Sequence, residues 1–190
     1  MARANLVIIT GPAAVGKSTT ARALQAHLAT EDRLWLLTEL DVFGRGLPRE
    51  WIAWGGRRGR LADLGFSYDQ TGDGIALTLG TDGRRVMAAF HRSIAAIAKS
   101  GLSVICETIV HDAEDWADWN EALAGLTPVW VRLRAAVPTL EAREQLRRPE
   151  GQGLGRGMSA RPLIGVYDVE ADTGSKRPEQ IAAEIASHMI

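Results

Sequence analysis

The sequence has a single cysteine, Cys106, among its 190 residues. One cysteine cannot form a disulfide or a cysteine-based zinc site within a chain. Because Cys106 lies in the apolar run "LSVICE", we expect a buried thiol at this position.

The sequence also lacks an excess of charge of one sign and any long apolar stretch. Lys and Arg together number 22 and Asp and Glu 23, so the formal net charge is −1. This balance provides no electrostatic footprint for nucleic acid. The first apolar run is about five residues, too short for a secretory leader, and no run approaches the ~20 residues of a membrane span. We therefore expect a cytoplasmic protein with no nucleic-acid partner and no membrane association, and a homo-oligomer stays open.

The clearest motif is the stretch "VIITGPAAVGKSTTARAL" near the N-terminus. It contains Gly11, four further residues and then Gly16-Lys17-Ser18, which completes the G-x-x-x-x-G-K-[ST] pattern of a P-loop. An apolar run at 6–10 precedes it and a helix-compatible run follows, as the mechanism requires. Successive N–H groups and the start of the helix then cradle a phosphate chain. We predict ATP and Mg²⁺ as cofactors, with Lys17 on the β/γ-phosphates and Ser18 on the metal. The predicted nucleotide-binding residues are Gly11, Pro12, Ala13, Ala14, Val15, Gly16, Lys17, Ser18 and Thr19.

Strand and helix signals alternate along the rest of the chain, which predicts an α/β fold with a parallel sheet. The expected strands are 6–10, "LWLLTEL", "LSVICET", "VWVRLRA" and "VYDVEADT", and the expected helices are 17–28, a long helix from Thr81, one capped by Asp112, 138–147 and 178–189. No linker or repeat divides the sequence, so we expect one domain over residues 1–190.

Two segments have no clear periodicity and are rich in glycine and arginine. Residues 42–80 are expected to be a long loop that binds the acceptor of a transferred group, because loops of that length are usually functional or disordered. Residues 143–160 are expected to form a lid that closes and excludes water.

Acidic residues follow two of the predicted strands. Glu39 and Asp41 end the second strand and share a side if the strand continues that far, and Glu107 ends the third. Parallel sheets bind ligands beyond these strand ends. Phosphoryl transfer to a hydroxyl needs a carboxylate that takes the proton, and we predict Asp41 for this role; the alternative is a strand-end cap or a surface carboxylate. Glu107, in the position of a Walker B acid, is predicted to hold Mg²⁺ through water or to bind the acceptor.

Arginines near the lid are candidates for stabilising the transferring phosphoryl group. Arg143 and Arg147 are four apart and share a helix face, and Arg148 and Arg156 follow in the glycine-rich segment. We expect at least one of them to contact phosphate, the alternative for any single one being a solvated side chain.

Histidines and tryptophans provide weaker candidates. His111 follows the third strand at the ligand-facing edge and is a candidate substrate contact, whereas His27 and His91 are expected at the surface. Trp51 and Trp54, in the long loop, are read as an aromatic surface for the acceptor or as loop packing. The helical Trp116 and Trp119 are expected in the core.

Taken in order, these motifs resemble the chloramphenicol 3-O-phosphotransferase family, a branch of P-loop kinases related to zeta toxins and shikimate kinases. The resemblance covers nearly the whole chain and rests on "GPAAVGKS", "LLTELDVF", "DGIALTLG", "LSVICETIV", "VWVRLRA", "EAREQLRRPEGQGLGRG" and "VYDVEADT". It implies a three-layer fold with a mainly parallel five-stranded sheet and an arginine-bearing lid. It also implies that Lys17 and Ser18 bind ATP and magnesium and that Asp41 is the base. Arg148 and Thr173 complete the predicted cofactor-binding set.

The sequence departs from the family pattern in two places. It has Glu107-Thr108 where the family member used for comparison has a pair of aspartates, and it is longer between Asp41 and the long helix. The expected function is ATP-dependent O-phosphorylation of a small molecule with a free hydroxyl, with a chloramphenicol-type antibiotic, and resistance by phosphorylation, as the first candidate. The alternatives are a metabolite, nucleoside or sugar-nucleotide kinase and, from another class, a non-catalytic nucleotide-binding switch. The absence of the guanine-reading N-K-x-D motif argues against a GTPase.

Overall fold

The computed structural model describes residues 5–29, 34–146 and 152–189. Its main sheet has five strands in the order β2-β7-β1-β8-β9, all parallel. The strands are β1 (Leu6–Thr10), β2 (Trp35–Glu39), β7 (Ser103–Glu107), β8 (Val129–Arg134) and β9 (Val169–Asp172). The predicted α/β fold with a five-stranded parallel sheet is thus confirmed.

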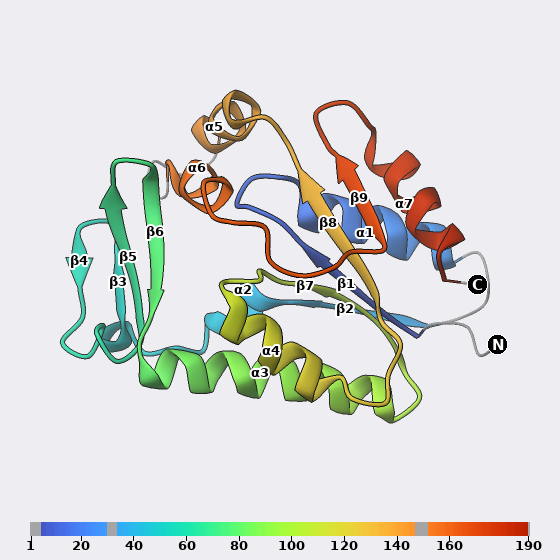
Figure 1. The fold of residues 1–190 in the computed structure, drawn as a ribbon, viewed down its shortest axis with the longest axis horizontal. Helices are drawn as coiled ribbons and strands as arrows, with labels where there is room; N and C mark the ends of the chain where they lie inside the picture. Colours follow the sequence, from blue (N-terminus) through green and yellow to red (C-terminus); the bar gives the residue numbers. More distant parts are fainter. Residues whose placement is uncertain (1–4, 30–33, 147–151, 190) are drawn as a thin grey trace.

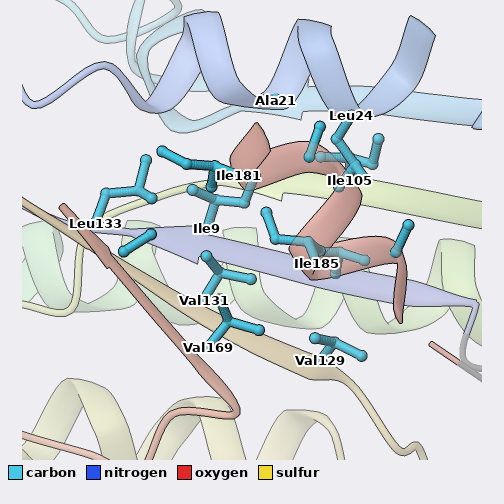
Figure 2. Packing of buried hydrophobic residues seen from close by; sticks show 14 of the residues in the cluster. Ile9, Ala21, Leu24, Ile105, Val129, Val131, Leu133, Val169, Ile181 and Ile185 are labelled. Carbon is cyan, nitrogen blue, oxygen red and sulfur yellow. The ribbon is translucent and has the colours of Figure 1, made fainter. Parts of the chain in front are cut away.

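Helices cover both faces of this sheet, which makes three layers (Figure 1). Every residue of the central strand β1 is buried, as expected for a strand covered on two sides. Val7 and Ile9 pack on one face against α1 (Lys17–Leu28) and α7 (Pro178–Ser187), and Figure 2 shows Ile9 among Leu24, Ile181 and Ile185 in this layer. Leu6 and Ile8 pack on the other face, where α3 (Thr81–Lys99) and α4 (Ala113–Ala122) lie.

The helix boundaries follow the sequence signals closely, with one exception. Asp112 caps α4 by accepting the backbone N–H of Asp115, as predicted. At the start of α3 the cap residue is Gly80, with no side-chain cap hydrogen bond, instead of Thr81 or Asp82. Trp119 is fully buried in the core. In the described part of the chain, no helix is both long enough and apolar enough to cross a membrane.

The expectation of a long loop over residues 42–80 is wrong, because this segment folds into a second sheet. After a short 3₁₀ turn, η2 (Arg49–Trp51), come β3 (Ile52–Trp54), β4 (Arg57–Arg58), β5 (Phe66–Thr71) and β6 (Gly74–Leu79), in the order β4-β3-β5-β6. β3 and β4 have only three and two residues, and β4 and the end of β5 are exposed, so hydrophobic periodicity does not reveal the sheet. Hairpin signals do exist: Gly55-Gly56 join β3 to β4 with φ of 59° and 77°, and Gly72-Asp73 join β5 to β6.

The second strand also ends earlier than expected. It stops at Glu39, and Leu40–Gly44 form the short helix α2, so Asp41 lies in the first turn of a helix. Glu39 and Asp41 therefore do not share a side of one strand. The apolar run "LWLLTEL" gave no signal for this change, because Leu40 suits either element.

The segment expected to be a lid begins in the last turn of α5 (Val137–Gln145) and contains the helix α6 (Leu154–Ser159). The short helix α6 was not predicted, since its sequence "LGRGMS" has two glycines and no apolar stripe. Figure 1 shows α6 and the second sheet standing together beyond one end of the main sheet. This is the end at which β1 leads into the P-loop.

Candidate active site

The P-loop joins β1 to α1 and has the backbone that its glycines allow. Gly16 has φ 103°, and a Cβ on Gly11 would stand 2.4 Å from the carbonyl oxygen of Leu133. Among the described residues, Ala14 is the only non-glycine with positive φ, at 59°. Lys17 Nζ donates to the carbonyl oxygens of Gly11 and Pro12, both at 3.0 Å. The loop is therefore wrapped around its own lysine, with the start of α1 beneath it.

A cavity of about 880 Å³ runs from the P-loop to the second sheet. At one end lie Lys17, Ser18 and Glu107. The other end is walled mainly by apolar and aromatic side chains from α2, the second sheet, α3, the segment after β7 and α6: Leu40, Phe43, Leu47, Ile52, Trp54, Phe66, Tyr68, Leu77, Val86, Met87, Ile109, Leu154 and Met158. The cavity thus has a phosphate-binding end and a largely apolar end.

Asp41 lines the cavity between these two ends. It is exposed, and none of the ion pairs found in the described part of the chain involves it. Glu39, by contrast, pairs with Arg22 at 2.9 Å and does not line the cavity. Of the two acids predicted at the end of the second strand, only Asp41 faces the space where an acceptor would lie.

Glu107 lies at the phosphate end and is nearly buried. Its Oε2 is buried without a hydrogen-bond partner among the described residues. Burial raises the pKa of this carboxyl, while the Lys17 charge and a hydrogen bond from Ser18 oppose the rise. A buried carboxylate oxygen that lacks a partner, beside a serine hydroxyl, fits a divalent cation that prefers oxygen ligands. Ser18 and Glu107 therefore fit the predicted Mg²⁺ site.

The aromatic residues of the segment 42–80 differ in whether they line the cavity. Trp54 lines the cavity and packs edge-on against Tyr68, with ring centroids 4.7 Å apart. Tyr68 also lines it, and burial followed by the charge of Asp41 raises the pKa of its phenol to about 12. Trp51 is not among the cavity residues, and its backbone packs against Gly65. The structure therefore brings Trp54, Tyr68 and Asp41 together and leaves Trp51 outside.

A smaller pocket of about 360 Å³ lies beside the P-loop and shares Gly16 with the main cavity. Arg143 lines it: Nη1 donates to Val15 O at 3.0 Å and to Thr173 Oγ1 at 2.9 Å, and Nη2 donates to Thr173 O at 2.8 Å. The pocket is lined by Val15, Gly16, Thr19, Thr20, Arg143, Leu146, Thr173, Lys176, Pro178 and Ile181. Two residues predicted from distant parts of the sequence, Arg143 and Thr173, thus meet beside the P-loop.

The remaining lid arginines do not gather at the phosphate end. Arg156 pairs with Glu141 at 3.5 Å, is partly exposed and does not line either pocket. Arg147 and Arg148 lie outside the described residues.

His111 and His91 are both buried and both away from the cavity walls. Arg161 donates to His111 Nδ1, and burial together with the charge of Arg161 lowers the pKa of His111 to about 4. The structure therefore places His111 in a network behind the cavity, not among its lining residues. The expectation of a surface His91 is wrong: it stacks on Trp119 with ring centroids 4.0 Å apart, and burial lowers its pKa to about 4. His91 lies four residues after Met87 and three before Ile94, and this helical spacing indicates that it shares their buried face.

Several residues of the site carried no motif in the sequence. Tyr68, Arg45 and Glu144 line the cavity, and Glu144 and Arg161 hold its surrounding elements. Arg45 caps the end of α2, four residues after Asp41, so its position could be inferred only once that helix was known. The position of Tyr68 could be inferred only from the β5–β6 hairpin. The positions of Glu144 and Arg161 depend on contacts between elements far apart in sequence.

Comparison with known proteins agrees with this geometry. The family model described as chloramphenicol phosphotransferase-like protein matches residues 4–190. No curated protein matches the chain significantly.

Solved structures that resemble the chain share its fold at low sequence identity. A sugar kinase from Janibacter sp. HTCC2649 has a TM-score of 0.65 at 16% identity, covering 97% of this chain and 93% of that one. The APS kinase CysC of Mycobacterium tuberculosis, in complex with AMPPNP and APS, has a TM-score of 0.64 at 19% identity, covering 97% and 96%. A shikimate kinase from Acinetobacter baumannii, in complex with shikimate, has a TM-score of 0.55 at 16% identity, covering 97% and 92%.

The family match spans almost the whole chain, and the fold, the P-loop and the adjoining cavity are those of a kinase for small molecules. The chain belongs to the chloramphenicol phosphotransferase-like family.

Proposed function

We propose that this small-molecule kinase transfers the γ-phosphoryl group of ATP to a hydroxyl of a small, largely apolar acceptor. The observation that carries the proposal is the single cavity with a P-loop at one end, apolar and aromatic walls at the other, and an unpaired Asp41 between them. A chloramphenicol-type antibiotic is the first candidate acceptor, and its phosphorylation would confer resistance.

The phosphate end supports binding of MgATP. The P-loop N–H groups and Lys17 would hold the phosphates, and Ser18 and Glu107 would hold Mg²⁺. Bound there, Mg²⁺ would neutralise charge on the β- and γ-phosphate oxygens. The smaller pocket beside the P-loop, with Arg143, Thr173 and Lys176, would receive the base and ribose. Because this pocket shares only Gly16 with the main cavity, a base and ribose held there would leave the main cavity free for the acceptor.

Asp41 would act on the acceptor hydroxyl. Its carboxylate accepts the hydroxyl proton as the acceptor oxygen bonds to the γ-phosphorus, the bond from that phosphorus to the β–γ bridging oxygen breaks, and ADP leaves. Because Asp41 has no ion-pair partner among the described residues, no competing cation holds its charge. Trp54 and Tyr68 would orient the body of the acceptor.

The apolar walls of the main cavity favour one class of acceptor over another. A sugar or another polyhydroxylated metabolite would turn hydroxyl groups towards Leu77, Met87 and Ile109, where they would lose hydrogen bonds to water. An apolar or aromatic molecule with one reactive hydroxyl suits these walls better. A non-catalytic switch would not require an exposed carboxylate such as Asp41 in a cavity next to the expected position of the γ-phosphate.

The experiment is a panel of hydroxylated antibiotics and metabolites, chloramphenicol included, incubated with MgATP and analysed by product mass. We expect one added phosphoryl group on at least one apolar acceptor and none with Asp41→Asn or Lys17→Ala protein that is folded by circular dichroism. Phosphorylation of polyhydroxylated compounds alone would overturn the assignment of acceptor class. Nucleotide binding without any transfer across the panel would favour the switch.

A further inference from the structure

The helix α6 closes the acceptor end of the cavity with little apolar anchorage. Leu154 and Met158 face the cavity, and the only buried residues of the helix are Gly155 and Gly157. What holds it is backbone contact with β6: Ile75 N donates to Gly153 O at 3.0 Å, and a Cβ on Gly157 would stand 2.1 Å from Ile75 O. Figure 1 shows α6 beside the top of β6.

Glu144 fixes the start of α6 from the neighbouring helix α5. Its side chain is buried, at 6% exposure. Oε2 accepts the N–H of Gly153 and Oε1 accepts the N–H of Gly155, both at 2.7 Å. Hydrogen bonds to a charged acceptor are short and strong, so one side chain holds two backbone groups that otherwise have no helical partner. The preceding residue, Arg143, donates hydrogen bonds to Val15 of the P-loop and to Thr173. Helix α5 therefore connects the P-loop to α6.

Arg161 fixes the chain just beyond the end of α6. Its Nη2 donates to Leu77 O at 2.6 Å, and its Nη1 donates to His111 O at 3.2 Å and to His111 Nδ1. Leu77 lines the cavity and is paired across β5–β6 with Tyr68. Arg161 itself does not line the cavity. It therefore ties together, from behind, β6 and the segment that follows β7.

We propose that Glu144 and Arg161 are positioning residues that hold α6, β6 and residues 108–111 in register as the acceptor end of the cavity. Glu144 is a buried charge and Arg161 a half-buried one, and the partners of each are mostly backbone groups of another cavity-forming segment, so its loss leaves those groups unpaired. Arg161 lines neither the main cavity nor the smaller pocket beside the P-loop, and both of its Nη atoms donate to carbonyl oxygens or to His111, so we assign it a positioning role. The kinetic consequence rests on the proposed function, whereas the structural consequence does not.

The structural test uses hydrogen exchange of the full chain without ligand, read segment by segment. The variants are Glu144→Gln and Arg161→Met, with Arg161→Lys as the conservative replacement. The matched controls are Glu121→Gln, an exposed acid on α4 that makes none of the ion pairs found among the described residues, and Arg85→Met, an exposed arginine paired with Asp82. We expect exchange at least about tenfold faster in α6, in residues 75–77 and in residues 108–111 for Arg161→Met, with the P-loop and α1 unchanged. Glu144→Gln should accelerate exchange mainly in α6 and at Ile75.

The kinetic test separates positioning from general destabilisation. We expect the KM of the acceptor found by the panel to rise at least about tenfold in both variants, while the affinity for MgAMPPNP stays within about threefold and the controls match the unmodified protein. Arg161→Lys should recover part of the acceptor KM, because one ammonium group can reach one of the two carbonyls.

The two tests fail in distinguishable ways. Exchange that accelerates everywhere alike, or in α6 alone for Arg161→Met, would overturn the proposal. An acceptor KM equal to that of the controls would overturn it as well. If the panel yields no acceptor, the proposed function fails while the exchange pattern still decides whether Glu144 and Arg161 hold these segments together.

Discussion

The phosphate end of the cavity comes from one continuous stretch, Gly11–Ser18, with Glu107 beside it, whereas the acceptor end comes from segments spread between Leu40 and Met158. At the phosphate end the proposed binding is mostly by backbone groups, and the loop conformation follows from its own glycines. At the acceptor end side chains form the walls, and the elements that carry them are held by other elements. A site of the first kind is encoded locally, while a site of the second kind depends on how distant segments meet.

Replacing the lysine of the phosphate end should have the largest effect on activity. Lys17→Ala removes the positive charge nearest the β- and γ-phosphates, so we expect phosphoryl transfer to fall below detection. The change should leave the fold intact, because Lys17 lines the cavity and is not part of the hydrophobic core. The rate of formation of phosphorylated product, followed by mass spectrometry, tests this expectation, and circular dichroism is the folding control. A folded variant with normal turnover would mean that the phosphates bind elsewhere.

Replacing the predicted base should affect chemistry at the meeting point of the two ends. Asp41→Asn keeps the shape of the side chain but cannot accept a proton, and loss of a general base typically lowers kcat by about 10²–10⁴. The KM values for ATP and acceptor should change little. Glu39→Gln is the matched control, because Glu39 lies two residues earlier and is engaged with Arg22. If kcat stays near normal in Asp41→Asn, the base is another group, with Glu107 next in line.

The two tryptophans of the second sheet provide a sharper test of the acceptor end. Trp54→Ala removes a cavity wall and the edge-on partner of Tyr68, so the acceptor KM should rise by roughly tenfold. The KM for ATP should not change, since Trp54 is not part of the phosphate end. Trp51→Ala should leave both KM values unchanged, because Trp51 does not line the cavity. Equal effects of the two substitutions on acceptor KM would show that the second sheet acts as a whole and not through Trp54.

Behind the acceptor end, a buried acid should affect stability and not turnover. Burial raises the pKa of Asp115 to about 7 from 3.8, and its Oδ2 accepts the N–H of His111. A raised folded-state pKa means that this group's stabilisation is fully present below the unfolded-state pKa and is lost as pH rises through about 7. Burial lowers the pKa of His91 to about 4, so its contribution has the opposite sign: it is present above pH 6.5 and lost as pH falls towards 4.

Asp115→Asn isolates the first of these two contributions. Asparagine imitates the protonated acid at every pH, so the free energy of unfolding of the variant relative to the unmodified protein should increase from pH 4 to pH 7 by an amount on the order of a few kcal/mol. Chemical denaturation at several pH values measures this difference. A difference that stays constant with pH would show that Asp115 does not titrate in this range.

The contrast between the two ends also explains which predictions succeeded. The P-loop with its strand and helix, the five parallel strands and most helix boundaries followed from periodicity, caps and one motif, all of which act over a few residues. The second sheet was missed because β3 and β4 have only three and two residues and because β4 and the end of β5 are exposed, so the sheet depends on packing against Met87 of α3 and on hairpin turns. Asp41 lines the cavity although the strand ends at Glu39, because α2 begins at the same edge of the sheet; its role as the base stays a prediction.

By itself the sequence determined the fold of the main sheet and the place of the phosphate end, because a strand, a loop of glycines and a helix that are adjacent in the chain are also adjacent in space. Only the tertiary structure decided that Trp54 faces the cavity and Trp51 does not, that Arg143 meets Thr173, and that Glu144 and Arg161 hold α6 and β6. These contacts join residues that are far apart in the chain; Arg161 and Leu77, for example, are 84 positions apart. Such contacts exist because the packed core brings their elements together, and no local pattern in the chain records them.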